Sequence, residues 1–587
     1  MKPIAIYLAR QLKRLPERQL LMVLSIVIGI LAAVAGHLLK LAIHFVQGVA
    51  NSFSEAAAVN WLYLIFPTIG ITLTVLFVKY WVKDNISHGV TRIFYAISRR
   101  ESRLPLHNTY TSVVASATTI GFGGSVGAEA PIVLTGAAIG SNLGQALKLP
   151  YNYITLLLGC GAAAAMAAVY KAPIAGFAFV IEVLMLELTF TSVVPLLIAS
   201  VTAATMTYLL IGIEPFFGSY TPTFNLGNVP YYIILGLLGG VMSYWFSAST
   251  MWLEKVFSRI SSQWRKIAIG GSVLGLLIFI FPPLYGEGYS TITQLLTGDT
   301  SEIFNNSLFY NIQNQFLTIL LYILGIMAFK VIAMTLTNSS GGVGGTFAPS
   351  LFFGAMMGFM FALTINHFFD THLPVGSFTL VGMACVMSGV MKAPITSMFL
   401  VAELTGGFQL FLPLMLCSAV SFALSYYFEP YSIYTKRLAA RGELLTHNKD
   451  DNALQFLKIE ELVERDFVTV EYNGKLRTVI RAVEQSSRNI FPVLQGEFFR
   501  GVITLDDIRA DMFMPSKWDR MPLTDYMHKA PEVILEGDEG RVVLDKFERS
   551  RSWNLPVVDA AGRYIGFVSK SRLLGAYREQ LQKMSAH

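Results

Sequence analysis

The sequence predicts a polytopic, all-α membrane protein with an internal repeat, followed by a small soluble α/β region. Three observations lead to this prediction. The 587 residues are 53% hydrophobic and only 14% charged, whereas about a quarter of the residues of soluble globular proteins are charged. Half of the charged residues, 41 of 82, fall in the last 137 positions, which separates an apolar body from a polar tail. Two Gly-rich passages within the apolar body repeat each other.

Apolar stretches predict the membrane spans. Stretches of roughly 20 residues, enough to cross about 30 Å of hydrocarbon, occur at 20–39, 61–82, 231–248, 267–284 and 316–336. The stretches 154–169 and 351–363 are shorter or interrupted by Gly and Pro. They predict broken helices, which membranes tolerate only where protein or a water-filled cavity surrounds the backbone.

Charged residues beside these stretches predict the topology. Five basic residues and one acid precede the first apolar stretch, and Lys436, Arg437 and Arg441 follow the last. By the positive-inside tendency, both termini of this multi-pass protein of the inner or plasma membrane should be cytoplasmic. The three cysteines lie in apolar surroundings and suit reduced packing residues. No basic tract interleaved with aromatic residues suggests a nucleic-acid partner.

The apolar body contains two copies of one pattern. The passage GGSVGAEAP at 123–131 is echoed by GGVGGTFAP at 341–349, and a Lys-Ala-Pro-Ile motif follows each passage after about 40 residues. Many transporters consist of two such halves, which meet near the bilayer midplane with broken helices pointing their N-termini at the substrate. We expect the halves at about 20–215 and 228–440.

An acid follows each Lys-Ala-Pro-Ile motif. Glu182 comes after Lys171, and Glu403 comes after Lys392. Charged residues within a membrane are costly and are usually paired. We therefore expect the two lysines to snorkel or to pair with the two acids, and so to hold the halves in register.

The polar tail is also a repeat. Residues 489–494 and 501–508 are mirrored by 554–559 and 566–573, and each copy has the pattern strand, turn, strand, helix. This pattern resembles the CBS domain, with one unit at 458–512 and a second at 522–577.

The CBS resemblance implies an adenine-nucleotide site. In the first unit, Thr504 and Asp507 stand at the positions that contact ribose in the family. The second unit keeps Ser569 but has Arg572 in place of the acid, where an arginine could meet phosphate. The alternative is that the pair only stabilises assembly and binds nothing.

The membrane body resembles the CLC chloride channels and chloride/proton antiporters. Gly127-Ala128-Glu129-Ala130-Pro131 is similar to their Gly-Lys/Arg-Glu-Gly-Pro segment, and 345–349 matches their Gly-x-Phe-x-Pro segment. Residues 87–91 resemble their Gly-Ser-Gly-Ile-Pro segment, and Tyr434 matches the pore tyrosine of the last membrane helix. The resemblance implies the CLC fold with an inverted repeat over 1–445, a homodimer with one pore in each subunit, and no enzymatic activity.

An anion in a membrane needs hydrogen-bond donors, and helix N-termini offer unsatisfied backbone N–H groups with a partial positive charge. Three such termini could converge on one chloride ion, with a tyrosine hydroxyl as a further donor. The expected chloride-binding residues are Ser87, His88, Gly89, Val90, Gly127, Ala128, Phe347, Ala348 and Tyr434. Whether His88 or Ser87 faces the ion, and whether Tyr434 or Tyr431 supplies the hydroxyl, stays open at this point.

Glu129 is the expected gate. A carboxylate in hydrocarbon is costly and usually functional. Placed among anion-binding amides, it can occupy the anion site when ionised and leave when it is protonated or displaced by chloride. The alternative is that Glu129 forms an ion pair with a buried basic residue, but no Lys or Arg lies close to it in the sequence.

Residue Val183 bears on the transport mechanism. CLC antiporters commonly carry a second acid directly after the equivalent of Glu182, and valine cannot carry a proton. The sequence therefore favours a passive chloride channel, gated by voltage or pH. A chloride/proton antiporter is the alternative, with Glu182 or Glu187 as proton relay. A nucleotide-reading sensor without ion flux has less support, because no kinase, cyclase or other catalytic motif is present.

Overall fold

The computed structural model divides into two compact units, Met1–Leu444 and Leu445–His587, and each is described by itself. The described residues are 16–52, 61–84, 86, 89–99, 102–185, 190–218, 224–298, 302–305, 307–309, 315–369, 371–439, 454, 457 and 459–585.

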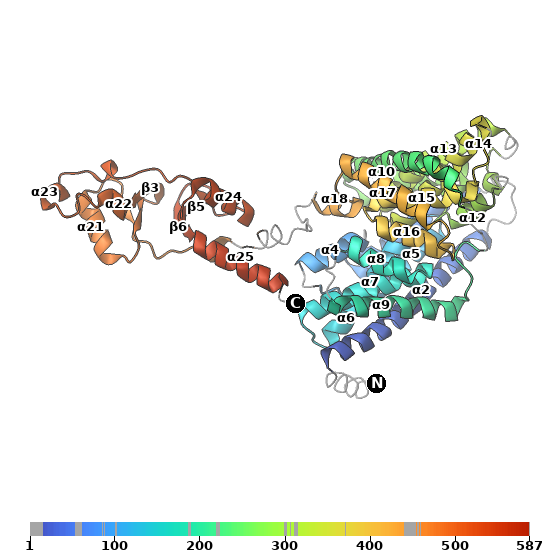
Figure 1. Cartoon of the computed structure of the whole chain (residues 1–587), viewed down its shortest axis with the longest axis horizontal. Helices are drawn as coiled ribbons and strands as arrows, with labels where there is room; N and C mark the ends of the chain where they lie inside the picture. The colour runs from blue at the N-terminus through green and yellow to red at the C-terminus, as the bar shows by residue number, and fades with distance from the viewer. Residues whose placement is uncertain are drawn as a thin grey trace. The chain divides into compact units, whose positions relative to one another are not determined.

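Within its described residues, the first unit is built of helices joined by turns and loops. The helices of its first half are α2 (Glu17–Ser52), α3 (Phe66–Phe77), α4 (Gly89–Arg99), α5 (Thr111–Gly121), α6 (Glu129–Ala146), α7 (Tyr151–Tyr170), α8 (Pro173–Glu182) and α9 (Phe190–Ile211). Those of the second half are α10 (Val229–Ser258), α11 (Gln263–Ile280), α12 (Tyr289–Thr297), α13 (Phe316–Ser339), α14 (Phe347–Phe369), α15 (Val375–Met391), α16 (Pro394–Leu404), α17 (Phe411–Phe428) and α18 (Ile433–Ala439). Figure 1 shows that most helices pack mainly against other helices of the same half.

Eight helices of the described chain are long and apolar enough to cross a membrane. The predicted span at 61–82 is not one regular helix. It consists of a 3₁₀ turn, η1 (Trp61–Leu64), then α3, then a π-helical turn, η2 (Val78–Val82).

The prediction that 154–169 and 351–363 form broken helices is wrong. Both stretches lie within continuous helices, α7 with 20 residues and α14 with 23. Their glycines serve close packing of two backbones instead. A β-carbon on Gly161 of α7 would lie 1.9 Å from the Gly136 carbonyl oxygen of α6, and one on Gly354 of α14 would lie 2.3 Å from the Gly382 carbonyl oxygen of α15. Small residues of this kind let membrane helices approach closely.

The breaks lie instead at the two Lys-Ala-Pro motifs. Helix α7 ends at Lys171, whose φ of 56° is left-handed, and α8 starts two residues later at Pro173. Helix α15 ends in the same way at Lys392, with a φ of 57°, and α16 starts at Pro394. Proline suits the first turn of a helix, where no intrahelical partner for its missing N–H is needed.

The short helices α8 and α16 exchange caps. Glu182, the last residue of α8, accepts the amides of Ile395 and Thr396 at 2.9 and 2.6 Å, at the start of α16. Glu403, near the end of α16, accepts the amides of Ile174 and Ala175 at 3.0 and 2.9 Å, at the start of α8. A reciprocal contact of this kind is the signature of two-fold symmetry, and it makes the two helices antiparallel, as an inverted repeat requires.

The predicted pairing of Lys171 and Lys392 with these acids is wrong. Lys171 Nζ donates to the carbonyl oxygens of Gly212 and Glu214, and Lys392 Nζ donates to Ser425 Oγ. The acids reach the free N–H groups of helix ends instead, where a carboxylate gains both hydrogen bonds and a favourable dipole.

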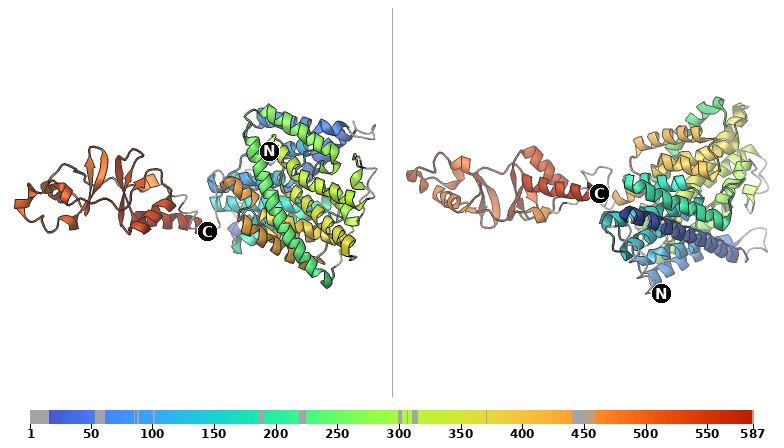
Figure 2. Two further views of the ribbon diagram at one scale, coloured as in Figure 1. Left: turned by 90° about the horizontal axis from the view of Figure 1, so that it is seen from above. Right: turned by 60° about the horizontal axis from the view of Figure 1, so that its bottom comes forward.

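The second unit contains two sheets of the same topology. The strands are β1 (Val470–Glu471), β2 (Ile490–Gln495) and β3 (Phe498–Thr504), then β4 (Ile534–Leu535), β5 (Asn554–Val558) and β6 (Tyr564–Ser569). In each sheet the first strand is parallel to the second, and the second is antiparallel to the third. The helices are α20 (Ile459–Leu462), α21 (Leu476–Gln485), α22 (Leu505–Ile508), α23 (Pro515–Trp518), α24 (Gly540–Ser550) and α25 (Lys570–Ser585). Both sheets are visible in the left view of Figure 2.

The two halves of this unit interlock. Helix α20, which precedes the first sheet, packs into the core of the second sheet, and Leu523, which precedes the second sheet, packs into the core of the first. Glu464 pairs with Phe567 of β6, and His528 pairs with Val502 of β3 in the equivalent place. The segments leading into each predicted CBS unit therefore belong to the core of the other unit.

Candidate functional site

Two buried loops, one from each half of the first unit, meet just before α6 and α14. The Gly127 amide donates to the Gly345 carbonyl oxygen at 3.0 Å, and the Gly345 amide donates to the Gly127 carbonyl oxygen at 2.7 Å. A β-carbon on Gly127 would lie 2.8 Å from the Ala348 β-carbon. The two loops could not approach so closely with larger residues, and they bring the N-termini of α6 and α14 together.

Glu129 is the first residue of α6 and is only 2% exposed. Its Oε1 atom accepts hydrogen bonds from the hydroxyls of Tyr170 at 2.5 Å and Tyr289 at 2.6 Å. Its Oε2 atom accepts the Ala348 amide at 3.4 Å, at the N-terminus of α14. The carboxylate thus lies on a helix N-terminus of the opposite half, as an anion would.

A third segment, at the start of α4, joins the same place. Gly89 and Val90 are buried, and a β-carbon on Gly89 would lie 2.5 Å from the Ala130 carbonyl oxygen of α6. The predicted filter residues Ser87 and His88 lie outside the described residues.

The predicted pore tyrosine is also close. Tyr434 of α18 is buried, and its hydroxyl accepts a hydrogen bond from Thr346 Oγ1 at 3.4 Å, one residue before Phe347. The alternative, Tyr431, is 43% exposed. The structure therefore brings together the described members of the predicted anion site, namely Gly89, Val90, Gly127, Ala128, Phe347, Ala348 and Tyr434.

Four side chains near Glu129 were not predicted from the sequence. Tyr170 and Tyr289 donate to it, and Glu287 accepts the amide of Ala128, the residue before it, at 3.0 Å. Lys330 of α13 is fully buried and donates to Ser125 Oγ at 2.9 Å and to the Gly286 carbonyl oxygen at 3.0 Å. Lys330 could have been recognised from the sequence, because it is a charged residue inside an apolar stretch. The others belong to ordinary helix ends and loops, and only the fold brings them here.

Glu182 and Val183, the described residues predicted to bear on proton transfer, lie at the end of α8. Val183 is buried at the end of α8. Glu182 beside it is held by three donors, the two amides of α16 and the Thr396 hydroxyl at 2.7 Å. Glu187, the other candidate relay, lies outside the described residues. The contacts of Glu182 are those of a helix cap.

The predicted nucleotide residues of the second unit lie at the start of α22. Thr504 caps this helix, and its amide and hydroxyl both donate to Asp507 Oδ2 at 2.7 Å. A cavity of about 590 Å³ has Thr504, Asp506, His528 and Trp553 in its lining, and Asp507 follows one of these residues in the sequence. A nucleotide-sized ligand fits such a volume.

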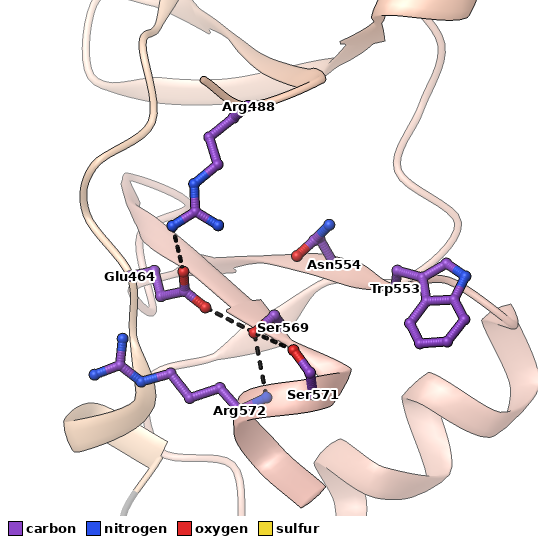
Figure 3. Close-up of a pocket in the computed structure, with 7 residues that line it drawn as sticks. All are labelled: Glu464, Arg488, Trp553, Asn554, Ser569, Ser571 and Arg572. Carbon is purple, nitrogen blue, oxygen red and sulfur yellow. Dashed lines mark hydrogen bonds and ion pairs between the residues drawn. The ribbon is translucent and has the colours of Figure 1, made fainter. Parts of the chain in front are cut away.

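A second cavity of about 500 Å³ lies beside Ser569 and Arg572 (Figure 3). Glu464 provides the carboxylate that the second unit lacks at position 572. Its Oε1 atom accepts a hydrogen bond from the Ser569 hydroxyl at 2.7 Å, and its Oε2 atom accepts one from the Arg488 guanidinium group at 2.7 Å. Arg488 also donates to Asp466, and this hydrogen bond lowers the pKa of Asp466. The cavity is therefore rich in charges that already satisfy one another.

Comparisons with known proteins identify the family. The family model described as voltage gated chloride channel matches residues 69–426, and the CBS domain model matches residues 523–579. The voltage-gated ClC-type chloride channel ClcB of Escherichia coli is 28% identical over 437 residues, which are 71% of this chain and 98% of that protein.

Solved structures share the fold. A CLC-type fluoride/proton antiporter is 26% identical with a TM-score of 0.58, and the match covers 70% of this chain and 96% of the antiporter. A eukaryotic CLC transporter is 16% identical with a TM-score of 0.63, and the match covers 94% of this chain and 97% of the transporter. The predicted fold, a CLC membrane body followed by a CBS region, is thus confirmed. Because the family model spans more than half of its residues, this integral membrane protein belongs to the CLC family of voltage-gated chloride channels.

Proposed function

We propose that this protein conducts chloride across the membrane as a channel, with Glu129 as its gate. The observation that carries the proposal is the contact of the Glu129 carboxylate with the Ala348 amide at the N-terminus of α14. A carboxylate and a chloride ion seek the same donors, so the two compete for this position. Chloride enters when Glu129 is protonated or displaced, and the path closes when the ionised side chain returns.

The absence of an acid at Val183 favours a channel, because the side chain that would pass protons from the inner side cannot ionise. One observation favours proton-coupled exchange instead. A solved relative, 26% identical, is a CLC-type fluoride/proton antiporter. Exchange would use Glu129 as a proton carrier and would need another inner acid, with Glu187 the first candidate.

Simultaneous chloride and proton fluxes from liposomes distinguish these functions. The purified protein is reconstituted with a chloride gradient, and a potassium ionophore clamps the voltage. A channel lets chloride leave without driving protons uphill. Proton uptake at a fixed ratio to chloride would establish exchange, and no chloride flux under either condition would contradict both, leaving a sensor.

We also propose that the CBS region binds an adenine nucleotide in the cavity beside Thr504. The Asp507 carboxylate is suited to accept hydrogen bonds from ribose hydroxyls, and such charged hydrogen bonds contribute about 1.5–3 kcal/mol each. Asp507→Ala should therefore weaken the binding of ATP to the full-length protein by about tenfold or more.

Calorimetric titration with ATP measures this effect. Ser569→Ala is the matched control, because Ser569 lines the other cavity and its hydroxyl already donates to Glu464. Equal ATP affinity of the parent and Asp507→Ala would exclude Asp507 from the nucleotide site, and no binding by the parent would leave the CBS pair with only a role in assembly.

A further inference from the structure

Two amides of the expected anion site are each covered by a carboxylate. The Ala348 amide donates to Glu129 Oε2 at 3.4 Å, and the Ala128 amide donates to Glu287 Oε1 at 3.0 Å. The first carboxylate comes from the start of α6 in the opposite half, as the sequence predicts for a gate. The second comes from the turn that leads into α12, which no sequence pattern connects with this site.

The turn that carries Glu287 is built to hold it in place. Gly286 and Gly288 both have positive φ, 64° and 89°, which is costly for other residues. A β-carbon on Gly288 would lie 2.4 Å from the Phe352 ring of α14, so the turn packs directly on the helix that carries Ala348. The backbone therefore fixes the direction of the Glu287 Cα–Cβ bond, while rotation about the side-chain bonds decides whether the carboxylate stays on the Ala128 amide.

Lys330 ties this turn to the loop before α6. Its ammonium group is fully buried and donates to the Gly286 carbonyl oxygen and to Ser125 Oγ, three residues before Ala128. Glu287 also interacts electrostatically with Lys330, Lys40 and Glu129. The two lysines offset part of the repulsion between Glu287 and Glu129.

We infer that Glu287 is a second anion-competing carboxylate, which must leave the Ala128 amide before a chloride ion can use that donor. The inference rests on the proposed function and adds a residue that sets anion affinity. In this scheme Glu129 and Glu287 cover different amides, one on each of the two helix N-termini. Chloride therefore gains the full set of donors only when both carboxylates have moved.

Glu287→Asp separates competition from simple charge repulsion. The aspartate keeps the negative charge beside Lys330 but is one methylene shorter, so it cannot reach the Ala128 amide. Competition predicts tighter chloride binding, by about tenfold, because the amide no longer loses a charged hydrogen bond when the ion enters. Glu287→Ala should bind chloride at least as tightly, and Glu214→Asp, at an exposed acid, should bind as the parent does.

Chloride titration by calorimetry on the purified full-length proteins measures the affinities, and thermal unfolding verifies that each variant is folded. Tighter binding by Glu287→Asp supports the inference. If only Glu287→Ala binds more tightly, charge repulsion accounts for the effect and competition is excluded. If the parent binds chloride and Glu287→Asp has the same dissociation constant, the inference about Glu287 is wrong, while the proposed function is unaffected. If the parent neither binds nor conducts chloride, the proposed function fails and the inference falls with it.

Discussion

Glu129→Gln will leave the chloride path open at neutral pH and remove most of its dependence on external pH. Glutamine keeps the shape of the side chain, and its oxygen can still accept the hydroxyls of Tyr170 and Tyr289. Its amide nitrogen would then face the Ala348 amide, donor against donor, where the carboxylate now accepts at 3.4 Å. The side chain therefore loses its hold on α14, and a bond of this charged type contributes about 1.5–3 kcal/mol. The closed state should become less populated by about tenfold or more.

Chloride efflux from liposomes, recorded from neutral to acidic external pH, measures this prediction. The parent should conduct more as the pH falls, because protonation releases Glu129, whereas Glu129→Gln should conduct at a high and constant rate. Glu214→Gln removes an exposed carboxylate and should behave as the parent does. A Glu129→Gln protein with the pH dependence of the parent would show that another group is the gate.

Gly161→Ala should prevent the first half from packing correctly. The added β-carbon would lie 1.9 Å from the Gly136 carbonyl oxygen and 2.5 Å from its carbonyl carbon. Both atoms belong to backbone, so α6 and α7 must move apart, and overpacking of a core typically costs about 1–3 kcal/mol. The same movement would separate Glu129, at the start of α6, from Tyr170, at the end of α7.

Thermal unfolding in detergent and the yield of monodisperse protein measure this effect. Gly48→Ala is the matched control, since Gly48 lies within α2 and a β-carbon there would meet nothing within 4 Å. That variant should be as stable as the parent or gain up to about 1 kcal/mol, because alanine favours a helix over glycine. A Gly161→Ala protein as stable as Gly48→Ala would show that the helices tolerate a wider separation.

The Gly-rich and Lys-Ala-Pro motifs show how far local sequence predicts the helices of the first unit. The repeated Gly-rich passages both start helices, at Glu129 and Phe347, as predicted, whereas the helix breaks lie at Lys171 and Lys392, where none was predicted. Glycine widens and proline narrows the range of backbone conformations, and both effects are local, so they can be read without the fold. The partners of the four charged residues near these breaks were predicted wrongly, because a carboxylate gains as much from free amides of a helix end as from a lysine.

The membrane body, its internal duplication and the CBS region could be predicted from the amino-acid sequence alone, and the same motifs singled out Glu129. These follow from composition and from motifs whose chemistry is local. The tertiary structure was needed to show that Gly136 and Gly161 let two continuous helices pack closely, and that Tyr170, Tyr289, Glu287 and Lys330 lie around Glu129. Such contacts join residues far apart in the chain. Their energies depend on distance and burial, which hydropathy and local motifs do not encode.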